Sequence, residues 1–233
     1  MKNIIIYLWG IYPVIFIRKV MNTFRSIVWL TGQFYDRNKK IKKDSAQWET
    51  EEYYKSDFYS AIQNEGEKRF VNYIVGNTEK QDRILDICCN QGRFLFELKR
   101  RGYSSLFGFD IMGAAINKLK RSPEYLPDII KVEHAQAQNY FNNNNDLSYD
   151  WAITYTATIE LINPEFDIFS ELGRTVKKGM FLAISENGHA YPRFYRLLHK
   201  MNGFEICSVT PLIDHENQIL SRLIHSVKRN TDG

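Results

Sequence analysis

Short apolar segments alternate with amphipathic segments between residues 83 and 185, and this alternation restricts the possible folds more than any other feature. The apolar segments have the length and boundaries of buried strands, and the segments between them repeat apolar residues at helical spacing. We expect strands over 83–87, 105–110, 129–133, 151–156 and 180–185. Helices between successive strands predict a mainly parallel sheet that is covered on both faces.

The remaining elements follow from the same patterns. We expect helices over 92–101, 114–121, 166–177 and 193–201, preceded by a helical and polar pattern within 44–77. The segments FEICSV (204–209) and QILSRLIHSV (218–227) predict two closing strands, which brings the sheet to seven strands. The four Asn and one Asp of residues 142–146 predict a surface loop.

The first 43 residues differ from the rest of the chain in charge. They hold nine Lys and Arg against one acid, a net charge of +8, so the other residues together carry −4 in a chain of net charge +4. A mildly acidic body argues against a nucleic-acid-binding protein. The apolar run Ile4–Ile17 is fourteen residues long, shorter than the ~20 residues that cross a bilayer. We therefore expect an N-terminal helical arm over 1–43 and one domain over 44–233.

Two interpretations of the arm stay open. Basic residues interleaved with Trp9, Phe24 and Trp29 suit a helix that lies at the surface of an anionic membrane. The alternative is an extension that packs on the domain or on a second copy of the chain in a homodimer.

The three cysteines, two of them adjacent, predict no disulfide framework and a reducing, cytoplasmic compartment. Membrane contact would then be peripheral, at the inner face.

Ligands of open α/β sheets bind beyond the carboxyl ends of the strands. The first expected strand runs into Asp86-Ile87-Cys88-Cys89-Asn90-Gln91-Gly92, and the second ends in Asp110. An acid at the end of the second strand can hold the hydroxyl groups of a ribose. The first hypothesis is therefore a ligand that contains adenosine.

The sequence of the loop after the first strand distinguishes between two kinds of adenosine-containing ligand. A dinucleotide requires G-x-G-x-x-G, so that backbone N–H groups reach the pyrophosphate, and here only Gly92 remains of such a pattern. A carboxylate such as Asp86 repels a pyrophosphate but attracts a sulfonium and an ammonium group. These residues favour S-adenosylmethionine (SAM) over NAD.

Four stretches resemble motifs of the class I SAM-dependent methyltransferases. ILDICCNQGRFLFELKRRGY resembles the first motif, an acid followed by x-G-x-G-x-G, and GFDIMGAAINKLK resembles the second. YDWAITYTATIELINP resembles the fourth motif, LGRTVKKGMFLAISE the helix and strand after it, and HAYPRFYRLLHKMNGFEICSV the last helix and strand. The resemblance covers about residues 48–228. It implies an α/β, Rossmann-like, seven-stranded and mostly parallel sheet with helices on both faces, to which the N-terminal helical arm is added.

The resemblance also implies roles for individual residues. The expected cofactor-binding residues are Asp86, Cys88, Asn90, Gly92, Asp110, Ile111 and Gln136. Cys88 and Asn90 stand where the family has glycine, and Gln136 stands where an acid usually meets the adenine amine. The expected catalytic residues, on the acceptor side, are Tyr155, Glu186 and His189. Leu161 occupies the place of a histidine that many family members carry, so no base is expected there.

The expected function is methyl transfer from SAM to a small-molecule or glycan acceptor, including a lipid-linked glycan, because no separate substrate domain interrupts the motifs. One alternative is a non-catalytic scaffold that lost SAM together with its glycines. Another is an adaptor that binds a membrane or a partner through the arm. The five histidines show no metal-ligand spacing, so no metal is expected. Neither G-x-S-x-G nor a P-loop is present.

Overall fold

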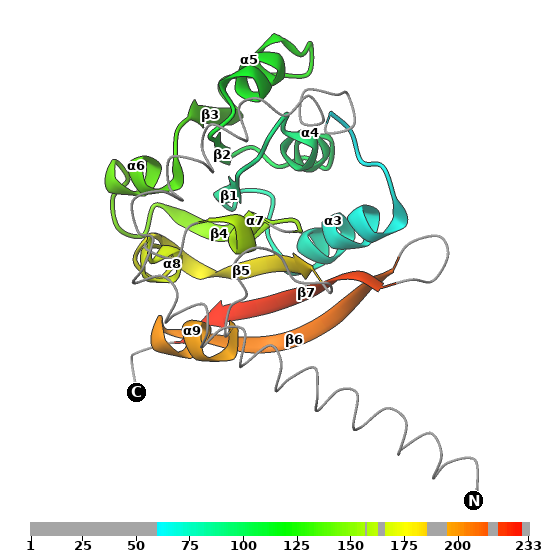
Figure 1. The fold of residues 1–233 in the computed structure, drawn as a ribbon. Helices are drawn as coiled ribbons and strands as arrows, with labels where there is room; N and C mark the ends of the chain where they lie inside the picture. Colours follow the sequence, from blue (N-terminus) through cyan, green and yellow to red (C-terminus); the bar gives the residue numbers. More distant parts are fainter. Residues whose placement is uncertain (1–59, 157, 163–165, 186–194, 214–218, 230–233) are drawn as a thin grey trace, which may run out of the picture.

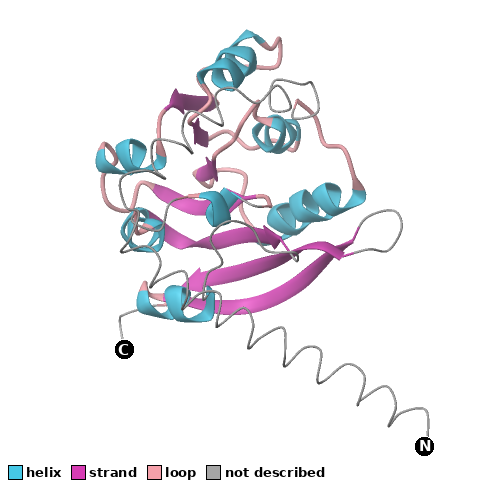
Figure 2. Cartoon of the chain, in the orientation of Figure 1, coloured by secondary structure: helices cyan, strands magenta, loops and turns pink. Residues whose placement is uncertain are grey.

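A computed structural model describes residues 60–156, 158–162, 166–185, 195–213 and 219–229, and the expected arm, 1–43, lies outside them. The described residues form one seven-stranded sheet with helices on both faces (Figures 1 and 2). The strands are β1 (Ile84–Ile87), β2 (Leu106–Asp110), β3 (Ile130–His134), β4 (Tyr149–Thr154), β5 (Val176–Ser185), β6 (Phe204–Ile213) and β7 (Ile219–Lys228). The helices are α3 (Glu65–Asn77), α4 (Arg93–Arg100), α5 (Gly113–Arg121), α6 (Ala137–Asn142), α7 (Thr158–Leu161), α8 (Ile168–Thr175) and α9 (Tyr195–Met201).

The strand order is β3-β2-β1-β4-β5-β7-β6. Strands β1 to β5 pair in parallel, and β7 runs antiparallel to both β5 and β6. The predicted seven-stranded, mostly parallel sheet is therefore confirmed. The chain moves outward from β1 to β3 and then returns to β4 on the other side of β1, so the strand order reverses between β1 and β4. Such a reversal opens a crevice at the carboxyl ends of the two strands.

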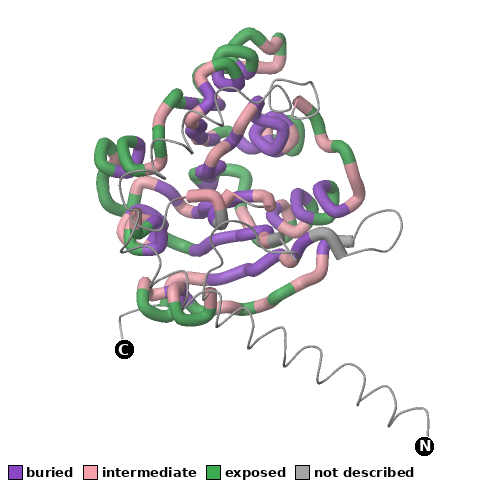
Figure 3. The backbone as a smooth tube through the Cα atoms, in the orientation of Figure 1, coloured by how far each residue is buried: buried purple, intermediate pink, exposed green. Residues whose placement is uncertain are grey.

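Successive side chains of each strand enter two separate cores. Ile84 packs with α3, α4 and α5 on one face, whereas Leu85 packs with α6, α7 and α8 on the other. The buried residues follow the centre of the sheet and the inner sides of the helices, as the purple parts of Figure 3 show. Because both faces of the central strands are covered, most of their residues are apolar, which is typical of parallel sheets.

The sequence patterns misplaced several boundaries, among them the end of β6, which is Ile213 rather than residue 209, and missed two helices. The predicted helix 166–177 is shorter, since α8 ends at Thr175 and β5 begins at Val176, where the buried valine pairs with Tyr149 of β4. At Val176 the pairing of β5 with β4 therefore outweighs the helical spacing of apolar residues in the sequence. Helices α6 and α7 have six and four residues, too few for a helical period to show in the sequence.

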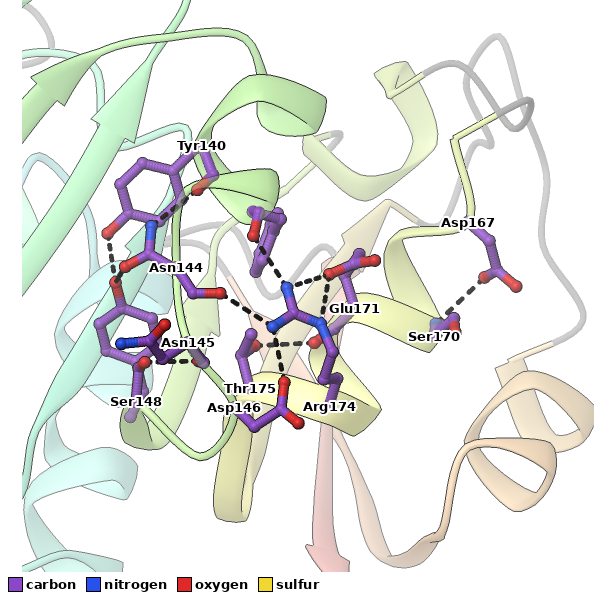
Figure 4. A network of polar contacts seen from close by, with 12 residues as sticks. Tyr140, Asn144, Asn145, Asp146, Ser148, Asp167, Ser170, Glu171, Arg174 and Thr175 are labelled. Carbon is purple, nitrogen blue, oxygen red and sulfur yellow. Dashed lines mark hydrogen bonds and ion pairs between the residues drawn. The ribbon is translucent and has the colours of Figure 1, made fainter.

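The asparagine-rich segment 142–146 is anchored by an arginine from a distant helix. Arg174 of α8 donates to the carbonyl oxygens of Phe141 and Asn144 and to the carboxylate of Asp146, each at 2.8 Å (Figure 4). Tyr149 donates from its hydroxyl to Oδ1 of Asn144 at 2.8 Å. The predicted loop is therefore present, and polar contacts hold it against α8.

Candidate functional site

The carboxyl ends of β1, β2 and β4 place three groups of residues at the crevice. The loop 88–92 follows β1, Asp110 ends β2, and Tyr155 directly follows β4. Because β1 lies between β2 and β4, these groups meet at one edge of the sheet. The sequence-based expectation placed the cofactor and the acceptor at this edge.

Three residues of the loop adopt left-handed backbone conformations. Cys88, Asn90 and Gly92 have φ angles of 55°, 48° and 79°. At Gly92 a Cβ atom would also lie 2.5 Å from Cδ1 of Leu119, so only glycine fits there. Cys88 and Asn90 therefore adopt a backbone conformation that glycine adopts most readily. Asparagine tolerates this conformation, whereas for cysteine it carries strain.

Asp110 joins the end of β2 to this loop. Its Oδ2 atom accepts a hydrogen bond from the backbone N–H of Asn90, and its Oδ1 atom accepts one from Met112, both at 2.8 Å. Burial raises the pKa of the Asp110 carboxyl, and the two backbone donors and His134 oppose that rise. Each carboxylate oxygen has a further lone pair, so these bonds are compatible with the expected contact to ribose hydroxyls.

Asp86 is a buried carboxylate with one unsatisfied oxygen. Its side chain is 2% exposed, and its Oδ2 atom has no hydrogen-bond partner among the described residues. Burial raises the pKa of the Asp86 carboxyl well above its usual range, Arg93 lowers it, and Asp110 raises it further. A buried carboxylate without a partner is costly. A cationic ligand at this edge would relieve that cost.

The charges around the loop favour a cation over an anion. Asp86, Asp110 and Glu67 are buried carboxyl groups, and Arg93 is the one buried arginine beside them in the described part of the chain. In their ionised forms the acids outnumber the arginine. A pyrophosphate would be repelled here, whereas a sulfonium with an α-amino group would be attracted. The residues present therefore fit SAM.

Tyr155 lies in an aromatic cluster at the carboxyl end of β4. Its ring centroid is 5.2 Å from those of Phe70 and Phe94, and the Arg93 guanidinium lies 5.6 Å from its ring. Burial and the negative charge of Glu67 raise the pKa of Tyr155 to about 12. The phenol therefore keeps its proton at neutral pH, where it can donate a hydrogen bond but is a poor base. Its catalytic role stays a prediction.

Ile111 and Gln136 lie farther along the same edge. The carbonyl oxygen of Ile111 is 2.9 Å from Nε2 of His134, and Gln136 is exposed at the residue before α6. The expected contact of Gln136 with an adenine amine stays a prediction. Glu186 and His189, the other two catalytic candidates, lie outside the described residues.

Sequence reasoning missed three residues that shape this edge. His134 ends β3, and Glu67 and Arg93 form a buried ion pair with 2.8 Å between Oε1 and Nη1. In the sequence, the only sign that Arg93 belongs to the site is its position directly after Gly92. Glu67 lies before the first matched motif, so the sequence gives no sign of its role.

The described residues contain no group of three or more potential metal ligands. Their helices are all too short or too polar to cross a membrane.

The comparisons with known proteins agree with this fold. Residues 84–179 match the sequence model of the methyltransferase domain family. The fold is similar to magnesium protoporphyrin IX methyltransferase from Synechocystis PCC 6803 with bound SAM, at a TM-score of 0.61 and 13% identity over 80% of this chain and 97% of that chain. A SAM-dependent methyltransferase from Methanosarcina mazei gives a TM-score of 0.52 and 21% identity over 67% and 96% of the two chains. The comparison with curated proteins gives no match.

A third structure supports the same architecture. A chain from the complex between the Haloferax volcanii Trm112 methyltransferase activator and a methyltransferase has a TM-score of 0.63 and 13% identity, over 82% of this chain and 98% of that chain. The fold is thus that of the class I SAM-dependent methyltransferases. The family match covers residues 84–179, and the matched domain implies SAM as the cofactor.

Proposed function

We propose that this enzyme transfers a methyl group from SAM to a small-molecule or glycan acceptor. The observation that carries the proposal is the pair of buried carboxylates, Asp86 and Asp110, on either side of a loop with three left-handed residues. This arrangement offers oxygen acceptors to a ribose at one end and to a cationic amino acid at the other. Neither carboxylate suits the phosphates of a dinucleotide.

The residues of the chain then have separate tasks in the reaction. Asp110 holds the ribose, Asp86 and the loop from Cys88 to Gly92 hold the methionine end, and Ile111 and Gln136 line the adenine. The bound cofactor supplies a methyl group that is already activated by the sulfonium. Tyr155 would contact the acceptor, and Glu186 and His189 are the other residues proposed to act on it. Holding the acceptor atom about 3 Å from the methyl group and in line with it accounts for much of the rate.

The size of the acceptor is inferred from the connections between the strands. The described connections between strands are short, and none forms a separate substrate-binding domain. A small acceptor, or the end of a glycan, fits such an open edge. Residues 1–43 would place the domain at the cytoplasmic face of an anionic membrane, where a lipid-linked glycan is presented. Packing of the arm on a second copy of the chain is the alternative.

A non-catalytic scaffold is the second candidate, because Cys88 and Asn90 replace two glycines of the loop. Against it, both residues adopt the left-handed conformation that glycine allows most readily. A loop that had lost its ligand would have no reason to retain this strained backbone at Cys88.

Two measurements test the proposed function. Calorimetry of the full-length protein with SAM should give saturable one-to-one binding, and a screen with methyl-labelled SAM against sugars, lipid-linked glycans and small amines should identify the acceptor class. Absence of SAM binding would refute the proposal and favour the scaffold. Binding without transfer to any acceptor in the screen would instead refute the proposed acceptor classes.

A further inference from the structure

The turn that connects β2 to α5 lies beside the end of β3. Asp110, the last residue of β2, is opposite His134, the last residue of β3, in the parallel register of the two strands. The carbonyl oxygen of Asp110 also accepts a hydrogen bond from the backbone N–H of Ala135 at 3.0 Å. Pairing therefore continues to the ends of both strands, and it brings the His134 side chain next to residues 111–113.

One peptide group of this turn is held at both of its ends. The carbonyl oxygen of Ile111 lies 2.9 Å from Nε2 of His134, and the N–H of Met112 donates to Oδ1 of Asp110 at 2.8 Å. A carbonyl oxygen can only accept, so Nε2 of His134 carries the proton and donates it. Because the peptide group is planar, the two hydrogen bonds fix a single rigid plane between the side chains of His134 and Asp110.

The imidazole ring of His134 also packs against Gly113, the first residue of α5. A Cβ atom at position 113 would lie 3.0 Å from Cε1 and 3.1 Å from Nδ1 of the ring. Gly113 is not among the glycines with positive φ, so its backbone conformation does not require glycine. The close approach of the ring explains why this position suits glycine.

We propose that His134 is a positioning residue for the cofactor. Through the peptide group between Ile111 and Met112, it holds the Asp110 carboxylate and the Ile111 side chain in the orientation that contacts the adenosine half of SAM. In this role His134 does not touch the cofactor itself. The inference rests on the proposed function, because it concerns the residues that the proposal assigns to the ribose and the adenine.

Two substitutions of His134 separate its hydrogen bond from its ring. His134→Phe keeps an aromatic ring but has no donor. His134→Gln has no ring but places an N–H donor the same number of bonds from Cα as Nε2 of histidine. Since His134 is exposed and water competes for this bond, we expect His134→Phe to weaken SAM binding about three- to tenfold in calorimetry. His134→Gln should stay within about twofold of the wild type, and so should the control Glu133→Gln, an exposed neighbour on β3.

Hydrogen exchange reports on the turn without any ligand. In His134→Phe the carbonyl oxygen of Ile111 loses its donor and the peptide group is free to rotate. The amide of Met112 should then exchange at least about threefold faster than in the wild type, as measured by NMR. The same amide should be unaffected in His134→Gln and Glu133→Gln.

A double-variant cycle tests the contact between the ring and the turn. In the wild-type background, Gly113→Ala should push the ring away from Ile111 and weaken SAM binding by about threefold or more. In the His134→Ala background, where no ring is present, the same substitution should change the affinity by less than about twofold. Equal losses in the two backgrounds would mean that the ring does not act on the turn, which overturns the proposal.

The other outcomes are equally distinct. Wild-type SAM affinity in His134→Phe overturns the positioning role. Weaker binding in His134→Phe with unchanged exchange of the Met112 amide means that His134 contacts the ligand directly, and this also overturns the proposal. A wild type that binds no SAM refutes the proposed function together with this inference, whereas a wild type that binds SAM beside unaffected variants refutes this inference alone.

Discussion

The carboxylate of Asp110 accepts a hydrogen bond from the backbone N–H of Asn90 at 2.8 Å, which ties the end of β2 to the loop that follows β1. The partners are twenty residues apart in the sequence. The sequence predicted a ribose contact for Asp110, and the structure adds a second role, in which the same side chain holds the loop in its left-handed conformation.

Replacing Asp110 by Ala should therefore weaken SAM binding and destabilise the loop. Hydrogen bonds to a charged group contribute roughly 1.5–3 kcal/mol each, so we expect SAM affinity to fall by at least about tenfold. Asp150→Ala is the matched control, because Asp150 also accepts a backbone hydrogen bond, from Arg83 at 2.8 Å, but lies at the amino end of β4, away from the loop 88–92. Unchanged SAM affinity in Asp110→Ala would show that Asp110 is not the ribose ligand.

Glycine should be tolerated at the two substituted positions of the loop. Asn90→Gly and Cys88→Gly both remove a side chain from a residue with positive φ, so SAM affinity should stay within about threefold of the wild type or improve. Cys88→Trp should abolish binding, because a large side chain would fill the space beside Asp86. Calorimetry compares the three variants, and normal binding by Cys88→Trp would exclude this loop from the cofactor site.

The thiols of the loop should be unreactive in the folded protein. Burial and the negative charges of Asp110 and Asp86 raise the pKa of Cys88 and Cys89 well above its usual range, so neither forms the reactive thiolate near neutral pH. Cys207 is exposed. A chromogenic disulfide reagent at pH 7 should titrate one thiol rapidly, three after unfolding and none rapidly in Cys207→Ser. Fast reaction of a second thiol would contradict the buried environment.

Arg174 should stabilise the fold without affecting the cofactor. Its guanidinium binds two backbone carbonyl oxygens and Asp146 and is about one-third exposed, so after allowance for solvent screening Arg174→Ala should lower the free energy of unfolding by about 2 kcal/mol. Arg100→Ala, which removes only surface ion pairs, should cost less than about 1 kcal/mol. Chemical denaturation measures both, and equal losses would show that the loop contacts of Arg174 contribute nothing beyond a surface pair.

The N-terminal arm should bind anionic membranes. Each basic residue near such a surface contributes about 1 kcal/mol, and binding should fall steeply with salt because salt screens the attraction between basic residues and anionic lipids. Vesicle flotation with increasing phosphatidylserine compares the full chain with a variant that lacks residues 1–43, whose SAM affinity should be unchanged. If the full chain stays unbound at low salt, the arm packs on the protein or on a second copy, and the lipid-linked acceptor loses its support.

Local patterns were sufficient to predict the architecture. Alternating strand and helix periods from residue 83 to 185, followed by two apolar segments, predicted the seven strands that the structure contains among its described residues. Asp86, Gly92 and Asp110 were found because each lies next to the end of a strand, and the ends of parallel strands share one edge. Helices α6 and α7 were missed because they are shorter than the window in which a helical period can be recognised.

The sequence by itself determined the order of the helices and strands and the edge of the sheet at which the candidate site residues lie. Both depend only on spacing along the chain. Only the tertiary structure decided that Cys88 and Asn90 adopt left-handed backbone conformations, that Asp110 holds their loop, and that Arg93 is paired with Glu67. These relationships join segments that are separated along the chain. They depend on burial and on the distances between charges, which arise only when the sheet brings α3, α4 and the strand ends together.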